Sequence, residues 1–126
     1  MTHRVLIVDD DPLVGRLFGM GLGQQGYEVE AALSGPAALE YLESHPVDVL
    51  VLDVMMADMD GLDVVGAIRG NPALKQLPII ILSARADDSS KRRGINAGAD
   101  VYLFKPITPE NLATVIRKVL ADSTTA

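Results

Sequence analysis

The sequence predicts an α/β fold, in which one parallel five-stranded sheet carries helices on both faces. Segments with helical spacing separate five short apolar runs, so strand and helix alternate five times with brief connections. Three of the runs are almost wholly Val, Ile and Leu, which is typical of strands buried on both faces. The runs are residues 5–8, 29–33, 47–52, 79–82 and 101–104.

The first helix is expected to begin at Asp11-Pro12, because an acidic cap followed by proline favours a helix start, and to end at Gly26. Its core-facing residues are expected to recur with a period of about 3.6. These residues are Leu13, Val14, Leu17 and Phe18. In the run that follows, Glu30 stands beside two alanines, and this weaker pattern indicates an edge strand.

Four more helices are expected. The second follows Ser34, and the third follows Gly61 and ends before Asn71. The fourth covers residues 87–96, and the fifth begins at Pro109. The helix at 87–96 is the most polar, so it has the least apolar area to hold it on the sheet. The core-facing residues of the other three are Ala37, Ala38, Tyr41 and Leu42, then Leu62, Val65 and Ile68, and finally Leu112, Val115, Ile116, Val119 and Leu120.

Composition limits the kinds of partner. Seventeen acidic residues against eleven basic ones give a net charge of −6, which argues against direct binding to nucleic acid or to an anionic membrane. The chain has no cysteine, no stretch apolar enough to span a membrane and no signal-peptide core. We expect a cytoplasmic domain at residues 1–121 and a flexible C-terminal tail at 122–126.

Polar residues stand at the carboxyl ends of four of the five runs. In a parallel sheet, ligands bind outside these ends, at the point where the strand order reverses. A flavodoxin-like (βα)5 three-layer sandwich with strand order 2-1-3-4-5 would place the first and third runs beside each other at this point. The residues delivered there are Asp9, Asp10 and Asp11, then Asp53, Ser83 and Lys105.

Such a group of residues suits phosphoryl transfer. Crowded carboxylates oppose folding unless a cation compensates them, and Mg2+ prefers a few carboxylates together with water and phosphate oxygens. Lys105 adds a point charge for a phosphate oxygen, and Ser83 adds a hydroxyl donor. Together with a nucleophilic carboxylate, these groups can stabilise an in-line displacement at phosphorus.

Four segments of the chain resemble the signature blocks of response-regulator receiver domains. From Asp53 to Ser83 is 30 residues and from Ser83 to Lys105 is 22, which also agrees with that family. The resemblance covers essentially the whole chain and implies a two-component signalling function. The segments are VLIVDDDP, VLDVMMADMDGLDV, IIILSARA and GADVYLFKP.

The resemblance implies a role for each site residue. Asp53 resembles the phosphoacceptor, and Ser83 and Lys105 resemble the pair that contacts the phosphoryl oxygens. A cis peptide bond is implied between Lys105 and Pro106. Ser83 and Tyr102 resemble the residues that move when the domain is phosphorylated. The implied Mg2+ ligands and their supports are Asp9, Asp10, Asp53 and the backbone carbonyl of Met55.

The resemblance also implies partners. The phosphoryl donor would be a phosphohistidine on a sensor histidine kinase or a histidine phosphotransfer protein. The domain would catalyse its own phosphorylation and dephosphorylation without turning over an external substrate. The output partner, or a C-terminal output domain, stays open, as do the signal and the oligomeric state.

Other interpretations stay open for single residues. Asp10 alone can be a helix cap, and Asp11 beside Pro12 is expected to be one. Ser83 alone can be a turn hydroxyl, and Lys105 alone can be a solvated lysine. The strip formed by Gly15, Gly19 and Gly23 allows either close packing against the last helix or docking of a partner's helix.

Three other functions compete with a phosphorylation switch. A haloacid-dehalogenase-type phosphohydrolase needs a second Asp two residues after its nucleophile, where this chain has Met55. A flavin carrier would set a flavin phosphate against crowded carboxylates. An interaction module with the same fold would take no phosphate at all.

Overall fold

The computed structural model describes residues 2–54 and 61–125, and its strands lie close to the five apolar runs. Each strand has four or five residues, and the largest difference from the prediction is a later start of the third strand. The strands are β1 (Arg4–Val8), β2 (Glu28–Ala32), β3 (Val49–Asp53), β4 (Ile79–Ser83) and β5 (Val101–Phe104).

A helix follows each strand, as predicted. Ser34 caps the second helix through its hydroxyl, which accepts a hydrogen bond from the N–H of Ala37 at 3.1 Å. The helices are α1 (Pro12–Gln24), α2 (Gly35–Ser44), α3 (Gly61–Arg69), α4 (Asp88–Ala97) and α5 (Pro109–Thr125).

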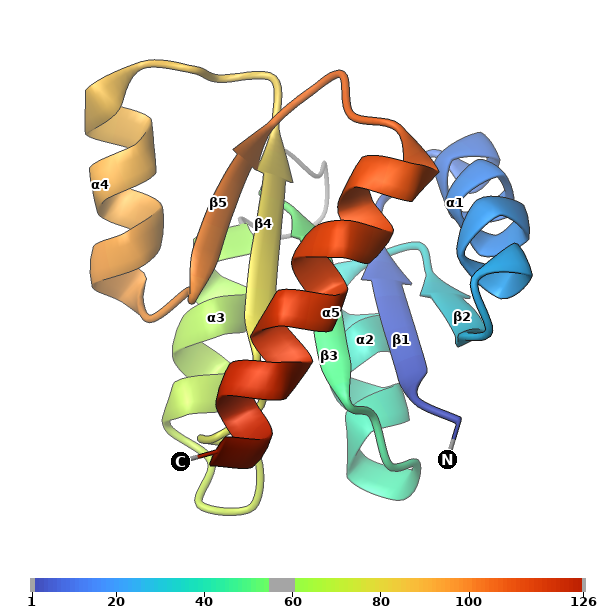
Figure 1. The fold of residues 1–126 in the computed structure, drawn as a ribbon. Coiled ribbons are helices and arrows are strands. Elements are labelled where there is room, and N and C mark those ends of the chain that lie inside the picture. The colour runs from blue at the N-terminus through green and yellow to red at the C-terminus, as the bar shows by residue number, and fades with distance from the viewer. Residues whose placement is uncertain (1, 55–60, 126) are drawn as a thin grey trace.

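The sheet has the strand order β2-β1-β3-β4-β5, and all neighbouring strands are parallel. The predicted fold class and order are therefore confirmed, including the edge position of β2. Figure 1 shows α1 and α5 on one face of the sheet and α2 and α3 on the other, with α4 beside β5. All carboxyl ends of the strands lie at the same edge of the sheet.

Alternation along the strands divides the core into two layers. Leu6 and Leu50 are fully buried in the layer formed with α2 and α3, whereas Val5 and Val49 are fully buried in the layer formed with α1 and α5. Strands that fill both layers have no solvent-facing side, which explains why the sequence runs are continuously apolar.

The prediction for α1 is wrong for two of its four core-facing residues. Leu13 is 65% exposed and Leu17 is 62% exposed, while Phe18 is buried and Val14 is half-buried. The reason is the close approach of α1 to β2 at Gly15, where a Cβ would lie only 2.8 Å from the Cβ of Ala31. This contact turns the Leu13 side of the helix toward solvent.

The same contacts explain the glycine strip of α1. A Cβ on Gly19 would lie 3.8 Å from Val29, so the strip faces β2 rather than α5, and a Cβ on Gly23 would meet nothing within 4 Å. The contact between α1 and α5 is made instead at Gly21, which lies against Pro109. The strip is therefore tightly packed on β2 at Gly15, makes an ordinary contact at Gly19 and is open at Gly23.

A hydrogen-bonded cluster around Arg69 joins the end of α3 to β4 and β5. The Nε atom of Arg69 donates to the carbonyl of Gly98 at 2.9 Å, and its Nη1 atom donates to the carbonyl of Leu77 at 2.6 Å. Its Nη2 atom donates to Asp100 at 3.1 Å, and the same Asp100 oxygen accepts from the N–H of Ile79 at 2.8 Å. The cluster fixes the edge of the sheet opposite the carboxyl ends of the strands.

Helix α5 continues through residues 122–125 of the segment expected to be a tail, and the flexibility of that segment stays a prediction. Within residues 2–54 and 61–125, no helix combines the length and the apolar character needed to cross a membrane.

Candidate functional site

The end of β1 leads directly into the start of α1. Asp9 is 5% exposed, and its carboxylate accepts a hydrogen bond from the N–H of Asp11 at 2.9 Å. The side chain of Asp11 in turn accepts from the N–H of Leu13 at 3.0 Å and caps the helix, as predicted. Because Asp11 is used as the cap, Asp9 and Asp10 are the acids of this segment that face the strand ends.

Three carboxylates come together at this edge of the sheet. Asp9, Asp10 and Asp53 each offer an oxygen, and these oxygens all lie within 4.8 Å of one another. Asp53 is the last residue of β3, the neighbour of β1, so the sheet order itself brings the carboxylates together. Clustered hard oxygen donors of this kind fit a divalent cation such as Mg2+.

Lys105 bridges two of the three carboxylates. Its Nζ atom lies 3.2 Å from Oδ2 of Asp9 and 3.4 Å from Oδ2 of Asp53. The side chains of Asp53 and Lys105 are 12% and 29% exposed, respectively. One positive charge therefore faces two partly buried negative charges, so the cluster can accept further positive charge.

The surroundings shift the pKa of both Asp9 and Lys105. Burial raises the pKa of the Asp9 carboxyl above its ordinary value of 3.8, and the nearby Asp53 carboxylate acts in the same direction. Burial alone would lower the pKa of Lys105, but the carboxylates of Asp53 and Asp9 outweigh it and raise that pKa above 10.5. Lys105 is thus held in its charged form.

Ser83 ends β4 beside the carboxylates. Asp53 pairs with Leu82 in the sheet register, so Ser83 lies one residue further along the neighbouring strand. Its side chain is fully buried, and its hydroxyl accepts a hydrogen bond from the N–H of Arg85 at 3.1 Å. This bond ties the hydroxyl to the start of the loop that leads into α4.

Tyr102 of β5 points into the protein and contacts the same loop. It is 7% exposed, and its hydroxyl donates a hydrogen bond to the backbone carbonyl of Arg85 at 3.0 Å. The ring lies against Gly94 of α4, where a Cβ would come within 2.8 Å of Cδ2 of Tyr102. The Arg85 backbone therefore connects Ser83 to Tyr102.

Most predicted site residues come together in the structure. Asp9, Asp10, Asp53 and Lys105 form one cluster, and Ser83 lies at the adjacent strand end. The predicted carbonyl ligand, Met55, lies outside the described residues. The Lys105-Pro106 peptide bond is cis, as expected.

Sequence reasoning missed the parts played by Gly94 and by the Arg85 carbonyl. A glycine inside a polar helix was the available signal for Gly94, because glycine there disfavours the helix unless packing requires it. No sequence signal marks a backbone carbonyl as the partner of a distant tyrosine.

Fold and site together define a class of protein. Three carboxylates and a lysine meet at the switch point of a five-stranded parallel sheet, and a carboxylate in such surroundings can accept a phosphoryl group. The site is connected through one loop to a buried aromatic residue, as expected of a switch. The arrangement is that of a phosphorylation-dependent signalling switch.

Comparison with known protein families supports this class of protein. Residues 5–117 match the response regulator receiver domain, and the chain belongs to that family. Its members have a phosphoacceptor role in two-component signalling, generally use Mg2+ and are signalling switches rather than enzymes that turn over a substrate.

Two curated relatives come from Mycobacterium tuberculosis strain H37Rv. The chain is 43% identical over 120 residues to the response regulator MprA, covering 95% of this chain and 51% of MprA. It is 38% identical over 122 residues to the transcriptional regulatory protein KdpE, covering 97% of this chain and 53% of KdpE. The chain thus spans about half the length of these relatives.

Solved structures share the whole fold. The chemotaxis response regulator CheY4 of Vibrio cholerae is 34% identical with a TM-score of 0.89, covering 94% of this chain and 99% of CheY4. A CheY-like receiver domain protein of Methanospirillum hungatei JF-1 is 27% identical with a TM-score of 0.92, covering 99% of this chain and 98% of that one.

Proposed function

We propose that this receiver domain accepts a phosphoryl group on Asp53 from a phosphohistidine donor, a sensor histidine kinase or a histidine phosphotransfer protein. The observation that carries the proposal is the bridge from Lys105 to Asp53 and Asp9, at 3.4 Å and 3.2 Å. A lysine held charged between two carboxylates is suited to receive a phosphoryl oxygen once one carboxylate has become an acyl phosphate.

Asp9, Asp10 and Asp53, together with the backbone carbonyl of Met55, would hold Mg2+. The donor set consists of hard oxygens, and three of them lie within 4.8 Å of one another, which suits this ion. Bound Mg2+ would supply positive charge to neutralise the phosphoryl oxygens.

In the transfer step, a carboxylate oxygen of Asp53 attacks phosphorus while the bond from phosphorus to the donor's histidine nitrogen breaks. The imidazole leaves with the electron pair of that bond and takes up a proton. Lys105 and the hydroxyl of Ser83 would bind phosphoryl oxygens and so lower the barrier. Water attack on the acyl phosphate, supported by the same residues, would reset the domain without an external substrate.

Phosphorylation would be transmitted through Ser83. Its hydroxyl now accepts from the N–H of Arg85, and the Arg85 carbonyl accepts from Tyr102. If the hydroxyl of Ser83 turns toward the phosphoryl group, its bond to Arg85 is lost and the loop can move. Tyr102 would then rotate and change the surface formed by α4, β5 and α5.

The donor protein would dock on the exposed apolar side of α1. Leu13, Leu17 and Met20 are each more than 60% exposed and follow one another at helical spacing. Helix α1 begins three residues after Asp9, so a partner helix on this side would lie beside the acceptor site. The output partner would be a protein surface or a further domain, because the net charge of −6 opposes direct binding to nucleic acid or anionic lipid.

Intact-mass analysis after incubation with acetyl phosphate tests the proposal. We expect one phosphoryl adduct that needs Mg2+, is abolished by EDTA and is lost in base. Asp53→Asn should show no adduct, whereas the matched control Asp63→Asn, an exposed acid on α3, should be labelled like the wild type. Labelling that persists in Asp53→Asn, or none in the wild type when CheY4 is labelled in parallel, would refute the proposal.

A further inference from the structure

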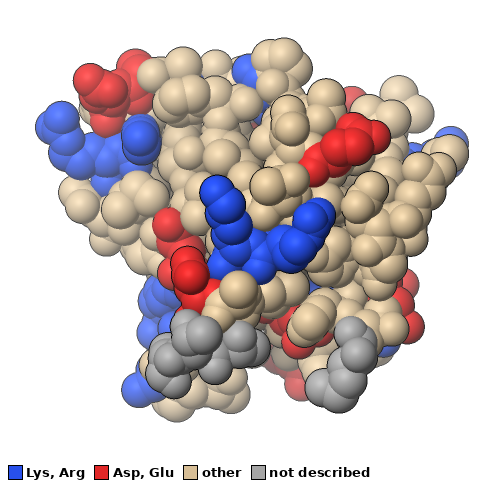
Figure 2. All heavy atoms as spheres, viewed as in Figure 1, with Lys and Arg blue, Asp and Glu red and all other residues tan. Residues whose placement is uncertain are grey.

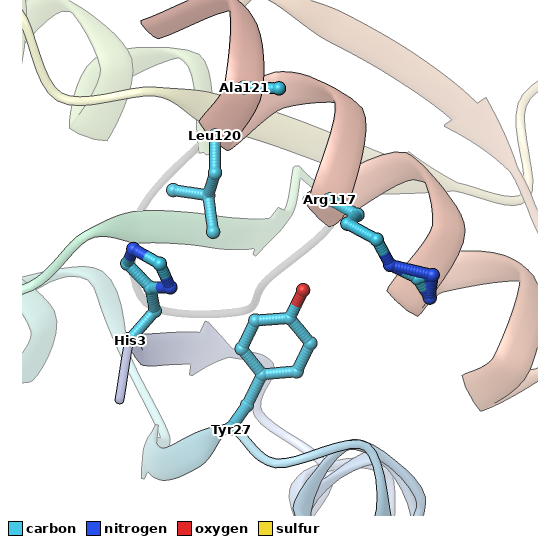
Figure 3. Close-up of a pocket in the computed structure, with 5 residues that line it drawn as sticks. All are labelled: His3, Tyr27, Arg117, Leu120 and Ala121. Atoms are coloured by element: carbon cyan, nitrogen blue, oxygen red, sulfur yellow. The ribbon is translucent and has the colours of Figure 1, made fainter. Parts of the chain in front are cut away.

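We propose that a small hollow at the amino ends of β1 and β2 binds a small organic monocarboxylate. The hollow has a volume of about 210 Å³ and is lined by His3, Tyr27, Arg117, Leu120 and Ala121. Figure 3 shows His3, Tyr27 and Leu120 around one space, with the side chain of Arg117 at its edge beyond the Tyr27 ring. It lies at the opposite edge of the sheet from Asp53, so it is separate from the phosphorylation site.

The sheet holds His3 and Tyr27 next to each other. Arg4 pairs with Glu28 in the register of β1 and β2, and the N–H of Glu28 donates to the carbonyl of His3 at 3.0 Å. His3 and Tyr27 are the residues that directly precede this pair, so their side chains lie on the same face. The backbone thus presents an imidazole and a phenol side by side to α5.

Glu28, the first residue of β2, is already paired and lies on the other face. Glu28 is bound to Arg4 at 3.3 Å, and alternation directs both side chains away from the face of Tyr27. The five lining residues include no carboxylate. The positive charge of Arg117 is therefore not neutralised by the residues that line the hollow.

Three side chains of the hollow that carry hydrogen-bond donors lack a partner in the described part of the chain. Within residues 2–54 and 61–125, no hydrogen bond or ion pair involves the side chains of His3, Tyr27 or Arg117. Figure 3 shows the hydroxyl of Tyr27 directed into the space between Leu120 and Arg117. Donors that line one hollow and remain accessible can bind a ligand rich in acceptor oxygens.

Charge and shape narrow the ligand class. Figure 2 shows basic side chains over the middle of α5, the helix that carries Arg117 and Lys118, on a protein with a net charge of −6. The overall charge repels polyanions, while the planar guanidinium of Arg117 matches a single carboxylate. Leu120 and the ring of Tyr27 supply an apolar wall, and a volume of about 210 Å³ admits a small ligand body.

Benzoate is a suitable probe, with benzamide as its neutral counterpart. Amide NMR spectra of the 126-residue chain would be recorded during titration without Mg2+, so that the acidic cluster stays out of the measurement. We expect saturable shifts at His3, Tyr27 and Arg117 with benzoate, and affinity at least about 10-fold lower for benzamide.

Variants separate this site from a general charge effect. Arg117→Gln should weaken benzoate binding about 10-fold or more, whereas Lys118→Gln, the same charge change one residue along α5, should leave it within about 2-fold. Both variants should be labelled normally by acetyl phosphate, because neither residue belongs to the Asp53 site. Equal binding to Arg117→Gln and the wild type, tighter binding of inorganic phosphate than of benzoate, or no saturable shift would overturn the proposal.

Discussion

The ammonium group of Lys105 lies 3.4 Å from a carboxylate oxygen of Asp53, although 52 residues separate them in the chain. Both residues stand at carboxyl ends of strands, and the order β3-β4-β5 sets these ends at one edge of the sheet. Burial lowers the pKa of Lys105, but the carboxylates of Asp53 and Asp9 outweigh it and raise that pKa, so this contact supplies a fixed positive charge where a phosphoryl group would form.

Replacing Lys105 should therefore slow phosphorylation. We expect Lys105→Met to reduce the rate of labelling by acetyl phosphate roughly 100-fold, the usual loss when one group that stabilises a transition-state charge is removed. Lys118→Met, on the exposed side of α5, is the control and should be labelled at the wild-type rate. Equal labelling rates for Lys105→Met and the wild type would show that the lysine plays no part in the transfer.

The contribution of Asp9 to stability without Mg2+ should fall as the pH rises through the acid range. Burial raises the pKa of Asp9 above 3.8, so the folded state holds that proton more tightly than the unfolded state. The free energy of unfolding contributed by Asp9 is thus highest below pH 3.8, decreases as the pH rises to the raised pKa, and stays low at neutral pH. Urea unfolding in EDTA at a series of pH values measures this.

Asp9→Asn removes the titrating group and is the test of that assignment. At pH 7 without Mg2+, the variant should be more stable than the wild type, and the difference should vanish below pH 3.8. Added Mg2+ should stabilise the wild type more than the variant, because it binds the folded acidic cluster. A variant that is less stable than the wild type at pH 7 would contradict the attribution to Asp9.

The inward position of Tyr102 should depend on Gly94. A Cβ at this position would lie 2.8 Å from Cδ2 of Tyr102 and 3.0 Å from Cδ1 of Ile81, so Gly94→Ala should displace the ring. We expect the variant to lose the nuclear Overhauser contacts between Tyr102 and Ile81 and about 1–3 kcal/mol of stability. In Gly66→Ala, where an added Cβ meets nothing within 4 Å, those contacts should persist and the helix should gain up to about 1 kcal/mol.

The exposed side of α1 should be needed for phosphoryl transfer from a donor protein but not for phosphorylation by acetyl phosphate. Leu17 is 62% exposed, so Leu17→Glu should leave the fold intact and disturb only an apolar contact with a partner. The donor for this test is the kinase that labels the wild type fastest in a panel of purified kinases. Its phosphoryl transfer to Leu17→Glu should be about 10-fold or more slower than its transfer to the wild type. Labelling by acetyl phosphate should not change.

Ile95→Glu is the matched control for this experiment, because Ile95 is a 40% exposed apolar residue on α4. Its transfer rate should equal that of the wild type. If Leu17→Glu and the wild type accept the phosphoryl group from the kinase at the same rate, the donor does not dock on this side of α1.

The strands of the sheet could be predicted from the sequence because strands buried on both faces must be continuously apolar, as residues 79–82 are. The sequence was sufficient for the acidic cluster because the strand order alone determines which strand ends meet. It was not sufficient for α1, where apolar residues occur almost all round the helix and periodicity selects no face. There, the contact of Gly15 with Ala31 decides which side is buried.

The connection from Ser83 to Tyr102 was also beyond the sequence. It passes through the backbone of Arg85, whose N–H and carbonyl have the same chemistry in every residue type except proline. Only the three-dimensional position of the loop after β4 reveals it. The side chain of Arg85 gave no indication of this role.

The most direct test of the central claim is to locate the phosphoryl group. After labelling with acetyl phosphate and Mg2+, borohydride reduces an aspartyl phosphate to homoserine, and peptide mass spectrometry identifies the converted residue. The proposed function requires conversion at Asp53, with Asp9, Asp10 and Asp63 unchanged. Conversion at Asp9 or Asp10, or a phosphoryl adduct that yields no homoserine, would contradict it.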